Sequence, residues 1–248
     1  MSDVRLVPAA ERVVLLEMLR PPNNFFDEAL LTDVADALQS ADDDESVSCV
    51  VLCSEGKHFC AGADLRGVGL AGTRRVYRQA YRIFSCRKPV VAAVQGAAIG
   101  GGLGLAMAAD FRVAAPGARM AANFARLGFH QGFGLTVTLP RALGHQRALD
   151  LLYTGRSVRG EEAVELGLCD RVAEDPRAVA IEFAAQIAAS APLSVPAIRA
   201  TMRRGMVARI SAALDDELNA QAALMDTADF AEGVAASVEK RTPRFTGR

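Results

Sequence analysis

Residues 88–109 read KPVVAAVQGAAIGGGLGLAMAA, and this stretch decides the fold class. Its apolar run at 90–94 predicts a buried strand, which the pair Gln95-Gly96 ends. A glycine-dense turn follows, and small apolar residues over 101–109 then predict a helix. The order strand, turn, helix is the repeating unit of α/β domains, so this stretch predicts an α/β fold.

The same order of elements extends to both sides of this stretch. Before it, hydrophobic spacing predicts a hairpin of two strands at residues 4–7 and 13–18. It also predicts a buried strand at 48–53 and helices at 27–40 and 73–84. After it we expect two short strands and then mostly helices, at 111–114, 119–122, 140–143, 146–153, 161–166, 177–189, 194–206, 210–224 and 229–239. We therefore expect an α/β core over residues 1–190 and a helical C-terminal region over 191–248. The apolar faces of these helices need the core, another subunit or both to cover them.

The composition is that of a folded globular protein. The chain has 248 residues, of which 51% are hydrophobic and 23% charged. Its net charge of −1 gives no global field that would attract a polyanion such as a nucleic acid, which leaves only a local basic patch for that purpose. No apolar run approaches the roughly 18 residues of a membrane span, and no secretory signal opens the chain. We expect a cytoplasmic protein that binds neither membrane nor nucleic acid. Five cysteines without a Cys-x-x-Cys pair predict buried reduced thiols.

Three common kinds of site fail on residue spacing. The glycines at 100–104 do not match Gly-x-Gly-x-x-Gly, and no phosphate loop ending in Gly-Lys-Ser or Gly-Lys-Thr occurs. A serine-hydrolase elbow would need a glycine where Arg159 stands, and every histidine precedes Ser157. The histidines at positions 58, 130 and 145 are also too widely spaced to form a metal site, so we expect none.

Two turns rich in glycine and alanine remain, which we name the first turn (residues 57–64) and the second turn (residues 95–102). Each follows a predicted strand, and small side chains leave backbone N–H groups uncovered. The second turn also opens the predicted helix, where the backbone carries a partial positive charge. Two such amides converging on one carbonyl oxygen form an oxyanion hole. On spacing alone, tight packing of strand against helix explains the turns equally well.

Further motifs occur in a fixed order along the chain: Leu19-Arg-Pro-Pro, Phe59-Cys-Ala-Gly-Ala-Asp-Leu65, Lys88 to Gly96, Gly100-Gly-Gly, Arg126-Leu-Gly128, Asp229-x-x-Glu-Gly233 and Glu239 to Gly247. Together they resemble the enoyl-CoA hydratase/isomerase (crotonase) superfamily over nearly the whole chain. This resemblance implies a crotonase-like spiral of ββα turns with a helical C-terminal trimerisation region, in a homotrimer or homohexamer. It also implies that the N–H groups of Ala63 and Gly101 hold the thioester oxygen of an acyl-CoA. Coenzyme A would then be part of the substrate, with no tightly bound cofactor.

The chain departs from the family pattern at the acid–base residues. Family hydratases place one catalytic Glu three residues after the oxyanion Gly and a second twenty residues later. Counted without gaps, these positions are Gly104 and Phe124, and no Glu stands between Glu55 and Glu161. The Asp residues in that interval are interpreted as structural: Asp64, Asp110 and Asp150. General acid–base catalysis contributes about 10²–10⁴-fold, so ordinary syn hydration needs a replacement group.

His130 is the best replacement, in the loop of residues 127–134, which we name the His130 loop. The resemblance puts this loop near the acyl pocket, and an ordinary histidine pKa of about 6.5 suits proton transfer. A loop histidine bonded to backbone is an equally good interpretation, whereas His58 is interpreted as structural. For substrate contacts we expect residues of both turns, the His130 loop and the C-terminal tail: Arg20, Ala61, Asp64, Leu65, Arg66, Leu103, Phe124, Phe129, Gln131, Phe133, Lys240 and Phe245. By resemblance, Lys240 and Phe245 match positions that contact the nucleotide end of coenzyme A.

The segment 66–88 carries seven basic residues and no acid, with Arg74, Arg78 and Arg82 on one helix face. A solvated face is the favoured interpretation, attraction of coenzyme A phosphates comes second, and RNA binding through Tyr77 and Tyr81 comes last. The sequence as a whole predicts an acyl-CoA-binding enzyme that acts through an enolate-like intermediate and hydrates crotonyl-CoA poorly. The alternative is a catalytically silent acyl-CoA-binding or assembly subunit.

Overall fold

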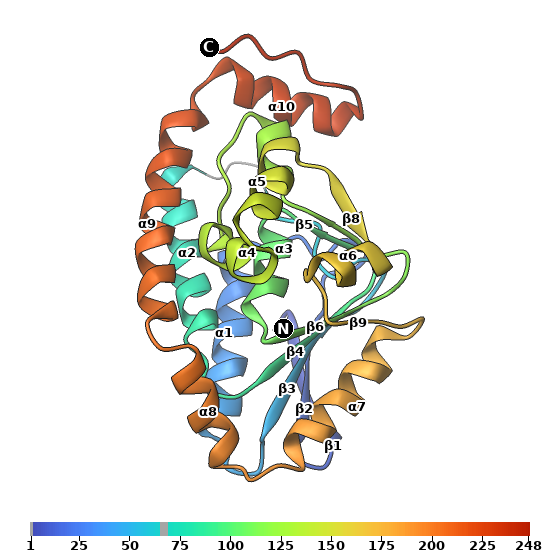
Figure 1. The fold of residues 1–248 in the computed structure, drawn as a ribbon. Helices are drawn as coiled ribbons and strands as arrows, with labels where there is room; N and C mark the ends of the chain where they lie inside the picture. Colours follow the sequence, from blue (N-terminus) through green and yellow to red (C-terminus); the bar gives the residue numbers. More distant parts are fainter. Residues whose placement is uncertain (1, 65–68) are drawn as a thin grey trace.

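The computed structural model describes residues 2–64 and 69–248, and it contains two sheets surrounded by helices (Figure 1). The larger sheet has the strand order β1-β2-β3-β4-β6-β9: Val4–Ala10, Val13–Met18, Cys49–Ser54, Val90–Val94, Phe111–Ala114 and Arg171–Val172. The smaller sheet has the order β5-β7-β8: Ala97–Ile99, Arg119–Ala121 and Ser157–Arg159. Strands β1 and β2 form the expected antiparallel hairpin, and the other neighbours in the larger sheet are parallel. The predicted α/β class is confirmed.

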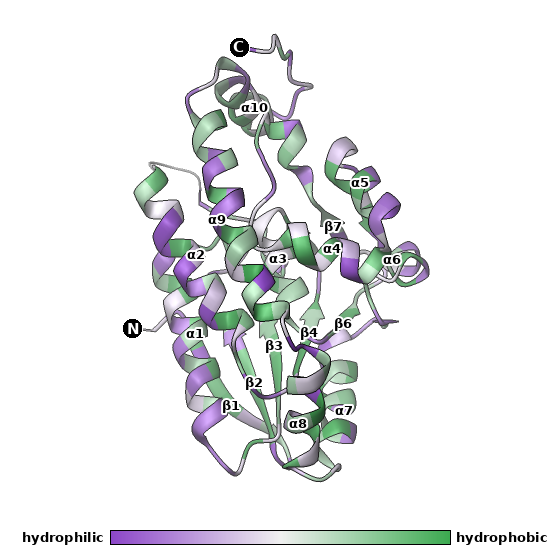
Figure 2. Ribbon diagram, turned by 60° about the vertical axis from the view of Figure 1, so that its left-hand side comes forward, coloured by the Kyte–Doolittle hydropathy of each residue, from purple (hydrophilic) through white to green (hydrophobic). Residues whose placement is uncertain are grey.

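The central strands β3 and β4 are buried along their whole length. Their continuous apolar runs, without polar alternation, suit a parallel sheet that is covered on both faces. One face packs against helix α7, Pro176–Ala188. The other packs against three helices: α1 Glu28–Asp43, α2 Leu70–Phe84 and α3 Gly101–Ala108. Figure 2 shows these hydrophobic strands between helices whose outer faces are hydrophilic.

The remaining helices lie around this sheet and on the second turn. They are α2 Leu70–Phe84, α3 Gly101–Ala108, the 3₁₀ helix η1 Asn123–Leu127, α4 Leu135–Leu143, α5 His145–Thr154, α6 Gly160–Leu166, α8 Ser194–Met202, α9 Met206–Met225 and α10 Ala228–Glu239. Helix α9 runs along α2 and also packs against α4, while α10 lies across η1 (Figure 1). The predicted boundary at residues 190 and 191 falls between α7 and α8 and stays a prediction.

Asp110 joins the helical C-terminal region to the sheet. Its carboxylate accepts hydrogen bonds from Arg199 Nε at 2.7 Å, Arg203 Nη1 at 2.9 Å and the Val90 N–H at 2.9 Å. Burial lowers the pKa of Arg203, and the positive charge of Arg199 lowers it further. Asp110 is therefore structural, as expected, and Asp150 likewise pairs with Arg156 at 2.8 Å.

Several predicted element bounds were wrong for local reasons. One helix was expected over 194–206, but Gly205 takes a positive φ of 74° and separates α8 from α9. Helix α4 begins at Leu135 and not at Pro140, so the proline lies inside the helix without an N–H to donate. Strands β5, β8 and β9 were missed because two or three residues are too few to show a period. Among the described residues, no helix is long and apolar enough to cross a membrane.

Candidate active site

The first and second turns lie side by side and are joined by backbone hydrogen bonds. The Phe59 N–H donates to the Gln95 carbonyl at 2.8 Å and the Cys60 N–H to the Ala97 carbonyl at 2.9 Å. Cys60 also accepts from the Ile99 N–H at 3.1 Å. A Cβ atom at Gly102 would lie 2.2 Å from the Cys60 carbonyl oxygen, so only glycine allows the turns to approach this closely.

The N–H groups of Ala63 and Gly101 take no part in these bonds. The backbone of Phe26 bridges the first turn through the Gly62 carbonyl and the Asp64 N–H, at 3.0 and 2.9 Å. In such a parallel bridge the N–H of the intervening residue, Ala63, points to the opposite side. Gly101 is the first residue of α3, where a helix leaves its N–H groups unpaired. Neither amide donates a hydrogen bond within residues 2–64 and 69–248, and both residues are partly exposed.

Phe26 supports both of these amides and was not identified from the sequence. Its backbone bridges to Ala63, and its ring lies so close to the second turn that a Cβ at Gly101 would be 2.5 Å from Phe26 Cζ. The side chain is 3% exposed, whereas the neighbouring Phe25 is 41% exposed. The available signal was an apolar residue directly before the α1 N-cap Asp27, which accepts from the Leu30 N–H at 2.9 Å.

Aromatic residues occupy the space at both positions that lack a glutamate, since Phe133 lies beside Gly104 and position 124 is itself Phe124. A Cβ at Gly104 would lie 2.5 Å from Phe133 Cβ and 2.9 Å from the Phe133 carbonyl oxygen. Phe133 is 1% exposed, has a positive φ of 58°, and packs edge-on against Phe26 with ring centroids 5.5 Å apart. Phe124 is buried, and its ring lies against Gly100, since a Cβ there would be 3.6 Å from Phe124 Cζ. Asn123 Oδ1 lies nearer still, 3.4 Å from the same Cβ position, so the surroundings of the second turn on this side are aromatic with one neutral amide.

Four predicted site residues share one pocket of about 350 Å³ between η1, α5 and α9. It is lined by Phe124, Ala125, Phe129, His130, Gln131, Leu149, Leu152, Tyr153 and Leu224. Phe124 lines this pocket, and its ring also lies near Gly100 of the second turn. His130 Nδ1 lies 2.8 Å from the Gln131 carbonyl oxygen, which can only accept. Nδ1 therefore carries the proton in the neutral ring, and Nε2 is the atom able to take one up.

Residues of α9 and α2, also missed in the sequence, hold the His130 loop in place. Gln221 Nε2 donates to the His130 carbonyl at 3.0 Å, and the Tyr77 hydroxyl donates to Gln221 Oε1 at 2.9 Å. The fully buried Glu217 accepts from the N–H groups of Gly134 at 2.9 Å and Thr136 at 3.0 Å. Burial raises the pKa of Glu217. The position of His130 thus depends on a helix about ninety residues later, as the Gln221 bond spans a sequence separation of 91.

The other predicted contacts are distributed around the first turn. Arg20 is held by carboxylates, with Nε 2.7 Å from Asp3 and Nη1 2.8 Å from Asp27. Ala61 donates its N–H to the Asn23 carbonyl at 2.9 Å, and Asp64 is partly exposed. Leu103 is fully buried in the core below the second turn. Two more predicted residues lie outside the described part of the chain: Leu65 and Arg66.

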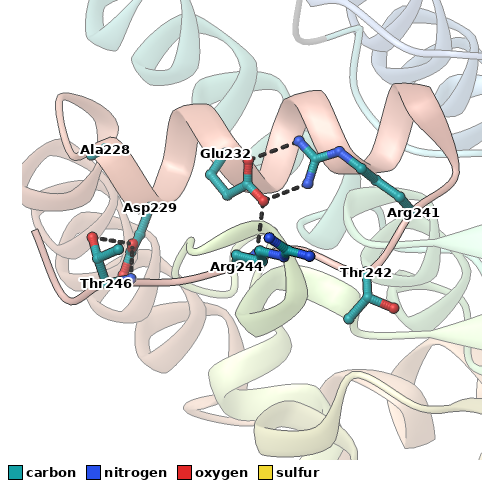
Figure 3. Close-up of a pocket in the computed structure, with 7 residues that line it drawn as sticks. All are labelled: Ala228, Asp229, Glu232, Arg241, Thr242, Arg244 and Thr246. Carbon is teal, nitrogen blue, oxygen red and sulfur yellow. Dashed lines mark hydrogen bonds and ion pairs between the residues drawn. The ribbon is translucent and has the colours of Figure 1, made fainter.

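The C-terminal tail folds back on α10 and forms a second pocket, of about 760 Å³ (Figure 3). Glu232 accepts from Arg241 Nη2 at 2.8 Å and from the Arg244 N–H at 2.7 Å, while Asp229 accepts from the Gly247 N–H at 2.8 Å. The predicted Lys240 ends α10 and Phe245 lies within the tail, and both are exposed. Neither lines the pocket that contains His130.

The basic segment on α2 is partly neutralised by α1. Arg75 pairs with Glu28 at 2.5 Å and Arg82 with Asp36 at 2.5 Å, while Arg74 and Arg78 are exposed. This agrees with the solvated face favoured from the sequence. In the described ranges, no group of three His, Cys, Asp or Glu side chains converges as a metal site would require.

The fold is that of an α/β protein. Its parallel strands end in two paired, glycine-rich turns that present backbone amides at one edge of the sheet, and helices pack over them. Its sequence matches the profile of the enoyl-CoA hydratase/isomerase family over residues 9–248. The chain belongs to this family, the crotonase superfamily that the motifs indicated.

Individual relatives agree with this assignment. A Mycobacterium tuberculosis protein named "Probable enoyl-CoA hydratase" is 40% identical over 210 residues, covering 81% of this chain and 82% of its own. The 1,2-epoxyphenylacetyl-CoA isomerase of Escherichia coli is 30% identical over 262 residues, covering 100% of both chains. The crystal structure of an enoyl-CoA hydratase/isomerase from Pseudoalteromonas atlantica superposes with a TM-score of 0.89 at 33% identity, covering 98% of this chain and 100% of that one. The expected crotonase-like fold is confirmed.

Proposed function

We propose that this protein binds the thioester of an acyl-CoA and stabilises an enolate at its carbonyl through the N–H groups of Ala63 and Gly101. The observation that carries the proposal is that neither amide donates a hydrogen bond to any residue of the described ranges, although each lies in one of two hydrogen-bonded turns. Backbone N–H groups left without partners at a partly exposed site are donors available to a ligand.

The chemistry follows from where negative charge develops. Removing a proton from carbon 2 moves charge onto the thioester oxygen, and two fixed N–H donors stabilise that oxygen more strongly than they stabilise the neutral carbonyl. The start of helix α3 adds its partial positive charge at Gly101. One donor of such a hole contributes about 3–4 kcal/mol in a well-studied hydrolase.

Ordinary hydration of a 2-enoyl-CoA is not the proposed reaction. Positions 104 and 124 carry Gly and Phe, and Phe133 fills the space beside Gly104. We assign proton transfer at carbons 2 and 3 to Nε2 of His130, with the acyl group in the apolar pocket beside it. A family relative that is an isomerase supports reactions other than hydration on this fold.

We propose further that coenzyme A enters as part of the substrate, with no tightly bound cofactor, and that the chain forms a homotrimer or homohexamer in the cytoplasm. Leu65, Arg66, Lys240 and Phe245 remain proposed contacts to coenzyme A.

Calorimetry with two ligands tests the oxyanion hole directly. Butyryl-CoA carries the thioester carbonyl, and S-butyl-CoA is the thioether that lacks this oxygen. Two hydrogen bonds of about 0.5–1.5 kcal/mol each should make butyryl-CoA bind about 5- to 150-fold more tightly. Equal affinities for the two ligands would sink the proposal. Mass spectrometry of the products formed from a panel of acyl-CoAs then distinguishes an enzyme from a catalytically silent binder. A silent binder prefers butyryl-CoA over S-butyl-CoA but forms no product from any acyl-CoA.

A further inference from the structure

His58 connects the first turn to the second through its side chain. Its Nδ1 atom accepts a hydrogen bond from the Ala97 N–H at 3.1 Å. A Cβ at Gly96 would lie 2.6 Å from this nitrogen and 2.1 Å from the Lys57 carbonyl oxygen, and Gly96 has a positive φ of 62°. The imidazole is therefore packed directly against the backbone that leads into Gly101.

The backbone of His58 is itself fixed, so the ring has a defined position. The His58 carbonyl accepts from Asn24 Nδ2 at 2.7 Å and from the Ser54 hydroxyl at 3.0 Å. Asn24 is fully buried, and its side-chain oxygen accepts from the Arg20 N–H at 3.0 Å. A shift of the ring would disturb this network as well as the Ala97 bond.

Only the neutral ring can make the bond to Ala97. An imidazole nitrogen that accepts a hydrogen bond carries no proton, so the proton is on Nε2. The charged groups acting on the ring are Lys57 in the same turn and Arg119, the first residue of β7, and both are cations. Burial and these two cations lower the pKa of His58. Arg119 also donates its N–H to the Gly96 carbonyl at 2.6 Å, so the second turn lies between the ring and β7.

We propose that His58 is a positioning residue that holds the second turn, and hence the Gly101 N–H, in register with Ala63, and that protonation of His58 releases it. A protonated Nδ1 presents a donor to the Ala97 N–H, which is also a donor, so the contact becomes repulsive. The two amides then no longer converge on one oxygen. This inference rests on the proposed oxyanion hole and adds a pH dependence to it.

The experiment measures the affinity ratio of butyryl-CoA to S-butyl-CoA between about pH 4 and pH 8, a range that extends below the ordinary histidine titration because the pKa of His58 is lowered. In the wild type the ratio should fall about three- to tenfold at the acid end, which is the effect of one lost hydrogen bond. His58→Asn places Oδ1 where Nδ1 was, so it keeps an acceptor that does not titrate. The affinity ratio of this variant should stay at the wild-type value for neutral pH and should not change with pH.

His58→Ala removes the acceptor, and its ratio should be low at every pH. If this variant does not fold, the wild type and His58→Asn still decide the matter. A wild-type ratio above one that does not change with pH overturns the role of His58, and so does a His58→Asn profile that follows the wild type. A wild-type ratio of one at every pH overturns the oxyanion hole itself, so the two failures are distinct.

Discussion

Phe133 lies against the backbone of Gly104, with only 2.5 Å between its Cβ and the position a Cβ would take at residue 104. Real Cβ contacts are not this short, so a side chain at 104 and Phe133 exclude each other. Phe133 of the His130 loop thus fills the space beside the position to which the family pattern, counted without gaps, assigns the first glutamate.

Gly104→Ala should therefore destabilise the protein by about 1–3 kcal/mol, the usual effect of overpacking a core. In an open helix the same change stabilises by about 1 kcal/mol, so the sign of the change in unfolding free energy shows whether the site is packed. Urea unfolding of the wild type and the variant measures this change. The matched control is Gly117→Ala, because nothing lies within 4 Å of a Cβ there. Gly104→Glu should add no hydration of crotonyl-CoA, followed by loss of the enoyl absorbance; a gain would contradict the proposed obstruction by Phe133.

His130→Gln should lower turnover of the protein's acyl-CoA substrate by about 10²-fold or more, because glutamine cannot take up a proton. The amide keeps a similar size and polarity, so the affinity for butyryl-CoA should change little. His145→Gln is the matched control and should retain the turnover, because this exposed histidine begins α5 and does not line the pocket. Unchanged turnover in His130→Gln would remove His130 from the mechanism.

Glu217 should make stability depend on pH in a defined direction. Its pKa is raised in the folded state by burial, so between the unfolded and folded pKa values the folded protein holds the extra proton. The contribution of Glu217 to the free energy of unfolding is complete below its pKa in the unfolded chain, about 4.3. This contribution decreases as the pH rises toward the pKa in the folded protein. Glu217→Gln does not titrate, so the stability of wild type minus variant should decrease between about pH 4 and pH 7. Thermal unfolding over this range measures the difference, and an increase would show that the hydrogen bonds to Gly134 and Thr136 outweigh burial.

Asp110→Ala should destabilise the fold by about 3–5 kcal/mol, since it leaves two largely buried arginines without their shared carboxylate. The control is Arg75→Ala, which breaks an exposed pair with Glu28 and should cost no more than about 1 kcal/mol. Chemical unfolding of both variants gives the comparison. Similar losses for the two would mean that Asp110 does not anchor α8 to the sheet.

Much of this protein is determined locally in its sequence. The strand at 90–94 was predicted with its observed bounds, because five consecutive apolar residues between Pro89 and Gln95 suit only a buried element. The paired turns were also visible, since runs of Gly and Ala mark backbone that other groups approach closely. The absence of Glu from positions 56–160 is likewise a property of the sequence alone.

Tertiary structure decided which groups meet. Phe26 precedes the second turn in the sequence and Phe133 follows it, yet both rings pack against it. Glu217 and Gln221 of α9 form hydrogen bonds with the His130 loop. His58 carries no local sign that its Nδ1 would accept from Ala97, 39 residues later. Short-range periodicity records which face of a segment is buried, but it holds no information on what lies against that face. The contacts that position the site join distant segments, and only the folded chain brings them together.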